Sequence, residues 1–171
     1  MDSGSNFDLM LKENSVYGRC KTSVNQWTMF FASGLVMAWM PAYIYACPMF
    51  DMAVSDFVTQ FVVVGTAGGT LLAWAYRSVA QKRRINLLAS QSHSNKKEKE
   101  EQQLALEKKT ADACCAYALY VVNASFLVLW LTTAFYVIPK MSTGNVSSSL
   151  NHLIAVGAPA TLLAFRAIAV F

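Results

Sequence analysis

The chain has 171 residues, 55% of them hydrophobic, and 14 Lys and Arg against 10 Asp and Glu give a formal net charge of +4. Four stretches carry no charged side chain: 22–50, 57–76, 113–139 and 141–165. Each is at least as long as the roughly 20 residues that a helix needs to cross a bilayer core, which argues against a soluble domain. The sequence therefore predicts an all-α polytopic membrane protein with a bundle of four transmembrane helices.

The predicted elements divide the chain into an N-terminal segment 1–26, a first pair of spans 27–76, a basic helical hairpin 77–112 and a second pair of spans 113–171. The spans themselves are expected at 27–46, 57–76, 113–138 and 150–171. The first twenty residues contain charges and no continuous apolar run, so no cleavable signal peptide is expected. Residues 139–149 (PKMSTGNVSSS) predict a turn between the last two spans.

Lysine and arginine are distributed unevenly along these elements. Of the fourteen, nine lie between Arg77 and Lys109, three precede the first span, and Arg166 lies near the end of the fourth. Only Lys140 falls in a turn on the other side. Because cytosolic segments of membrane proteins carry an excess of Lys and Arg, both termini and the hairpin are expected in the cytosol. The cations nearest to span ends are expected to set this topology: Arg77, Lys108, Lys109 and Arg166.

The hairpin is predicted to consist of two helices that continue the neighbouring spans. Residues 77–90 contain no Gly or Pro and extend span two. Asn95 is a candidate cap for a second helix, 96–112, which would run into span three. The apolar seam between the two arms is thin, and it would consist of Val79, Ile85, Leu87 and Leu88 against Leu104 and Leu106.

The cations farther from the spans form a candidate binding surface: Lys82, Arg83, Arg84, Lys96, Lys97 and Lys99. Three roles are compatible with them, namely contact with RNA phosphates, contact with anionic lipid headgroups, or a topology signal alone. The first arm carries only basic charges, whereas four Glu residues dilute the charge of the second. The first arm is therefore favoured for nucleic-acid contact.

Other chemistry is not indicated. No ionisable side chain lies deep inside a predicted span, which argues against a pump, an ion-coupled transporter or an intramembrane enzyme. The two histidines, His93 and His152, are far apart in the sequence, and no phosphate loop or nucleophile motif is present, so no catalytic residue, metal or cofactor is expected. For Cys114 and Cys115, apolar packing is favoured over palmitoylation. Glycosylation at Asn145 stays open.

Gly65 and Gly69 lie four residues apart in span two. This small-xxx-small spacing allows two helices to approach closely in a membrane, so both glycines are predicted to pack against another helix. The pattern does not say whether that helix belongs to this chain or to another.

The order of these features resembles the translocon-associated protein (signal sequence receptor) gamma subunit family. Five segments carry the resemblance: 7–19 (FDLMLKENSVYGR), 40–51 (MPAYIYACPMFD), 71–80 (LLAWAYRSVA), 96–112 (KKEKEEQQLALEKKTAD) and 122–139 (VNASFLVLWLTTAFYVIP). Each is of low specificity, and their order and spacing carry the weight. The insert is shorter than in the family around 90–95, so fewer or different ribosomal contacts are expected.

The resemblance implies a non-enzymatic subunit in the endoplasmic reticulum membrane, assembled with alpha, beta and delta subunits beside the Sec61 channel. It implies that the hairpin contacts the large ribosomal subunit through RNA and protein, and that the complex assists co-translational translocation. The alternative is a structural subunit of a membrane complex whose basic hairpin docks on anionic membrane lipid.

Overall fold

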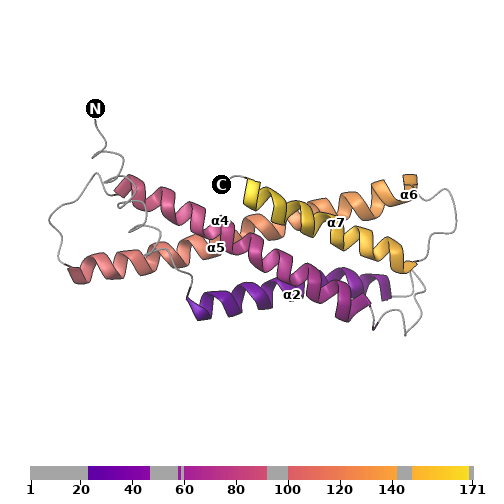
Figure 1. Cartoon of the computed structure of the whole chain (residues 1–171), viewed down its shortest axis with the longest axis horizontal. Coiled ribbons are helices and arrows are strands. Elements are labelled where there is room, and N and C mark those ends of the chain that lie inside the picture. Colours follow the sequence, from indigo (N-terminus) through magenta and orange to yellow (C-terminus); the bar gives the residue numbers. More distant parts are fainter. Residues whose placement is uncertain (1–22, 47–57, 59, 92–99, 142–147, 170–171) are drawn as a thin grey trace, which may run out of the picture.

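The structure is a computed structural model that describes residues 23–46, 58, 60–91, 100–141 and 148–169. Every secondary-structure element in these ranges is helical, which confirms the all-α prediction for the described part of the chain. The elements are α2 (Val24–Ala46), η1 (Gln60–Val64), α4 (Gly65–Gln91), α5 (Glu100–Thr132), η2 (Thr133–Val137), α6 (Ile138–Met141) and α7 (Ser148–Ala169). Helix α4 lies at the centre and contacts α2, α5 and α7 (Figure 1).

Among the described residues, two helical segments are long and apolar enough to cross a membrane, 106–140 with 35 residues and 150–167 with 18. At about 1.5 Å per residue, the first is longer than the roughly 30 Å of a bilayer core and would extend beyond it. The first predicted span, 27–46, lies within α2, whereas the second, 57–76, includes residues 57 and 59, which lie outside the described part of the chain. The total of four spans therefore stays a prediction.

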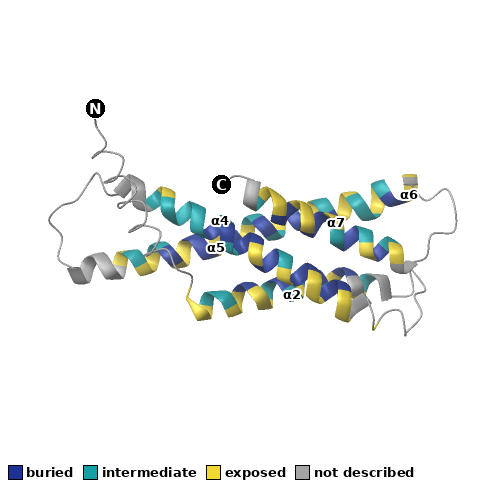
Figure 2. Cartoon of the chain, viewed as in Figure 1, coloured by how far each residue is buried: buried dark blue, intermediate teal, exposed yellow. Residues whose placement is uncertain are grey.

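Large apolar side chains lie on the outside of the bundle as well as in its core. Exposed residues recur along the long helices (Figure 2). Tyr120 is 76% exposed, Phe165 71% and Val128 64%. Soluble monomers rarely expose apolar surface on this scale, whereas a helix surrounded by lipid or by partner helices does so by necessity. The outer surface is thus suited to a membrane and not to water.

The core is built largely from small residues, with a few aromatic side chains between them. Ala38 of α2, Ala73 of α4, Ala118 of α5 and Ala160 of α7 are all completely or almost completely buried. Small side chains allow helices to pack closely without a hydrophobic driving force, which is how membrane bundles are stabilised. In the predicted seam of the hairpin, Leu106 is 48% exposed, whereas Val79, Ile85 and Leu87 are half-buried.

Helices α2 and α4 approach so closely that their backbones touch at glycine. A Cβ atom on Gly34 would overlap the carbonyl oxygen of Gly69, and one on Gly69 would lie 3.0 Å from the amide nitrogen of Leu35. A Cβ on Gly65 would overlap the indole ring of Trp39. The helix facing both predicted glycines is therefore α2 of the same chain, and Gly34 is the counterpart that the sequence pattern did not single out.

The end of the third long helix differs from the predicted turn. Residues 139–141 continue as helix α6 after the π-helical turn η2, in which the amide of Ile138 donates to the carbonyl of Thr133 five residues earlier. In a regular α-helix the ring of Pro139 would clash with the carbonyl of the residue four positions before it. A wider π turn just before the proline relieves this conflict, so the helix can continue to Met141.

Candidate functional site

The basic residues of α4 lie at one end of the bundle, together with the start of α2, the early part of α5 and the end of α7. Arg77 lies 5.2 Å from the ring centroid of Trp27, which belongs to the first turns of α2. Lys82 lines a pocket with Arg166 of α7. We call the end of the bundle that contains Arg77, Lys82 and Arg166 the basic end. These contacts place the start of α2 and the end of α7 at the same end.

The three consecutive cations Lys82, Arg83 and Arg84 point in different directions, because successive residues of an α-helix are about 100° apart. The guanidinium carbon of Arg83 lies 3.4 Å from the ring centroid of Tyr117 on α5. That distance is well within the range of about 6 Å for a cation–π interaction. Each of the three side chains is half-buried. They are therefore held against neighbouring helices along part of their length.

Arg84 lies on the side of α4 that faces both α5 and α2. It borders a small hollow with Gln26, Ala111 and the two cysteines of α5. Its Nε atom is buried and has no hydrogen-bond partner within the described residues. The half-buried Arg84 side chain therefore lies partly within the interface of these three helices.

The alignment of α4 with α5 differs from the one that the predicted span ends imply. The sequence placed Lys82, Arg83 and Arg84 well beyond the membrane, with span three beginning at residue 113. The structure instead places Arg83 opposite Tyr117, inside that predicted span. Helices α4 and α5 run antiparallel and cross, and they diverge toward the C-terminal end of α4 (Figure 1).

The remaining predicted site residues divide into two groups. Lys108 and Lys109 are exposed on α5, as befits cations at a membrane surface. Lys96, Lys97 and Lys99 lie outside the described residues, as does Asn145. At the opposite end of the bundle, Lys140 donates a 2.7 Å hydrogen bond to the hydroxyl of Tyr136.

Polar and reactive groups elsewhere in the bundle are held in the helix interfaces. The hydroxyl of Tyr76 donates a hydrogen bond to the Oδ1 of Asn123, which joins α4 to α5. Cys114 and Cys115 are free thiols, and both are buried between α5 and its neighbours, in keeping with a packing role. Within the described residues, no group of three His, Cys, Asp or Glu side chains could hold a metal ion.

Comparison with known proteins gives a consistent result. The family model described as "Translocon-associated protein, gamma subunit (TRAP-gamma)" matches residues 7–169. The chain is also similar to the translocon-associated protein subunit gamma of Dictyostelium discoideum, with 25% identity over 153 residues, which is 84% of this chain and 86% of that protein. The family match thus covers nearly the whole bundle, including the basic end.

Proposed function

Since this chain belongs to the translocon-associated protein gamma subunit family, we propose that it is a non-catalytic subunit of a translocon-associated complex in the endoplasmic reticulum membrane. In this proposal it crosses the membrane four times, with both termini and residues 77–112 in the cytosol. It assembles with alpha, beta and delta subunits next to the Sec61 channel and assists co-translational translocation.

The observation that carries this proposal is the unequal distribution of positive charge between the two ends of the bundle. Four cations of α4 and Arg166 of α7 gather at one end, whereas Lys140 lies at the other. The positive-inside rule then places the basic end in the cytosol. The start of α2 and the end of α7 lie at this same end of the bundle, which supports a cytosolic location for both termini.

We further propose that the basic end and the hairpin bind the large subunit of the ribosome, through both RNA and ribosomal protein. Of the six predicted contact residues, Arg83 and Arg84 lie on the described surface that faces α5. Lys82 turns toward α7, and Lys96, Lys97 and Lys99 lie in the undescribed part of the hairpin. Arginine suits this role because its planar guanidinium can bind a phosphate with two hydrogen bonds.

The test is cosedimentation of the detergent-solubilised full chain with ribosomes over a range of salt concentrations. Each phosphate contact contributes roughly 0.7–0.9 to the slope of log affinity against log salt. The double variant Arg83→Gln and Arg84→Gln should therefore flatten the slope by that amount for each phosphate that no longer binds an arginine. Tyr117→Leu removes the ring beneath Arg83 without changing the charge, and Lys140→Gln removes a cation from the opposite end.

Both control variants should keep the parent slope. If the double variant also keeps it, Arg83 and Arg84 do not contact ribosomal RNA. If the double variant keeps its binding to ribosomes and instead loses binding to anionic liposomes, the proposal of ribosome binding is replaced by the alternative of a structural subunit whose basic hairpin docks on lipid.

A further inference from the structure

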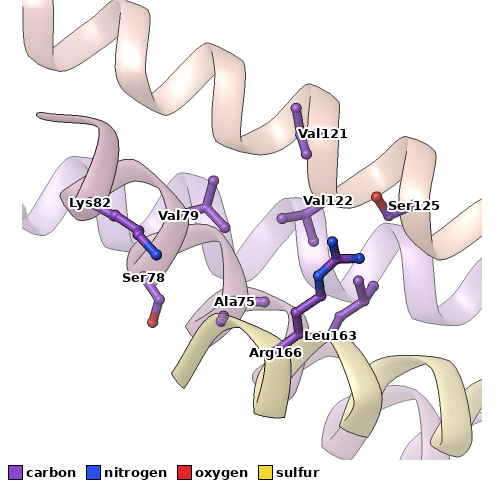
Figure 3. A pocket seen from close by; sticks show the side chains of 10 residues that line it. Ala75, Ser78, Val79, Lys82, Val121, Val122, Ser125, Leu163 and Arg166 are labelled. Atoms are coloured by element: carbon purple, nitrogen blue, oxygen red, sulfur yellow. The ribbon is translucent and has the colours of Figure 1, made fainter. Parts of the chain in front are cut away.

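A pocket of about 250 Å³ opens between α4, α5 and α7 at the basic end of the bundle. Lys82 and Ser78 reach it from α4, and Arg166 reaches it from α7 with its guanidinium directed toward Val122 and Ser125 of α5 (Figure 3). Two cations from different helices thus line one cavity. Of the described residues that line it, none is acidic.

The lining of this pocket has a polar part and an apolar part. The two cations and the hydroxyls of Ser78 and Ser125 supply hydrogen-bond donors. The rest of the lining is apolar and is shared among the three helices: Ala75, Val79, Val121, Val122, Leu163 and Ala167. A ligand that fits both parts must carry a negative charge at one end and hydrocarbon at the other.

The position of the pocket along the helices matches the headgroup layer of a membrane. Arg166 comes at the end of the apolar stretch 150–167, and long cationic side chains at such helix ends extend to the membrane interface. Basic pockets between membrane helices on the cytoplasmic side are known to receive lipid phosphates. The volume is below the roughly 300–1,000 Å³ of typical small-molecule sites, which suits a headgroup and not a whole lipid.

We propose that this pocket binds the phosphate of one anionic glycerophospholipid from the cytosolic leaflet. Lys82 and Arg166 contact the phosphate, the serine hydroxyls donate to its oxygens, and an acyl chain lies along the apolar wall formed by α5 and α7. RNA is a poorer match for this site, because its phosphates bring no hydrocarbon to cover the apolar wall. The two proposals rest on different residues of the basic end, since Lys82 and Arg166 line this pocket and Arg83 and Arg84 do not.

The experiment uses the full chain in a nonionic detergent, titrated with dioleoyl phosphatidic acid and followed by native mass spectrometry. One phosphatidic acid should bind with higher affinity than dioleoyl phosphatidylcholine. Lys82→Gln and Arg166→Gln should each weaken it by about tenfold, the scale of one charged hydrogen bond. Ser125→Leu should weaken binding without changing the charge, because the larger side chain fills the pocket.

Lys109→Gln is the matched control, since it removes one cation from an exposed position of α5 that does not line the pocket. It should keep the affinity within about twofold of the parent, the scatter expected for surface charges. The proposal is overturned if Lys109→Gln weakens binding as much as Arg166→Gln. It is equally overturned if Ser125→Leu, Lys82→Gln and Arg166→Gln all bind normally, or if inorganic phosphate displaces the lipid.

Discussion

The contact between α2 and α4 at glycine leads to a sharp prediction for Gly34→Ala. The added Cβ would overlap the carbonyl oxygen of Gly69, and it would lie 3.2 Å from the carbon of that carbonyl and 3.3 Å from the amide nitrogen of Ala73. All three atoms are backbone, so no side chain can rotate away. The two helices must move apart to accommodate the methyl group.

The expected cost follows from two opposing terms. Overpacking a close contact costs about 1–3 kcal/mol, and the rigid backbone puts this site near the upper limit of that range. Replacing Gly by Ala inside a helix returns about 1 kcal/mol. The net destabilisation of about 2 kcal/mol corresponds to a shift of about 30-fold in the unfolding equilibrium.

The assay is unfolding of the full chain by sodium dodecyl sulfate in mixed detergent micelles, followed by circular dichroism. Gly157→Ala is the control, because a Cβ there meets nothing within 4 Å, and it should stabilise the chain by about 1 kcal/mol. The stability of Gly68→Ala should fall between those of the other two variants, since its Cβ would lie 3.2 Å from a methyl carbon of Val156. Equal stability of Gly34→Ala and Gly157→Ala would refute this account of the α2–α4 contact.

The other two stability predictions concern the packing of α4 against α5. Tyr76→Phe should lower the free energy of unfolding by about 0.6 kcal/mol, a typical value for hydrogen bonds between membrane helices, because Asn123 no longer has its donor. Adding Asn123→Ala should then cost less than it does in the parent, and full additivity in the same unfolding assay would contradict the pairing. Tyr117→Leu should cost about 0.5–2 kcal/mol because it removes the aromatic ring beneath Arg83, whereas Tyr120→Leu, at a 76% exposed position, should cost less. Equal destabilisation by these two variants would argue against the cation–π interaction.

The sequence predicted the helical elements well because membrane spans are defined by composition and length. The extension of span two through Arg77 was also predictable, since residues 77–90 lack any helix breaker, and α4 does continue to Gln91. The helix beyond Pro139 was missed, because only the geometry of the preceding π turn removes the clash of the proline ring.

The candidate site was less predictable, since it depends on how the helices are aligned. A basic triplet is visible in the sequence, but its position along the bundle depends on which residue of α5 lies opposite it. Arg83 lies opposite Tyr117 because of the way in which α4 and α5 cross. The thin seam that was predicted to include Leu106 did not indicate this crossing. Likewise, nothing in the sequence brings Lys82 close to Arg166, which is 84 positions later.

The central claim, a four-span translocon subunit whose basic end faces the ribosome, is tested most directly by a cryo-electron density map of native ribosomes bound to endoplasmic reticulum membranes. In that map, the bundle should lie in the membrane beside the channel, with the ends of α4 and α5 directed toward the large ribosomal subunit. It would be contradicted by a map in which Lys140 and the opposite end of the bundle face the ribosome.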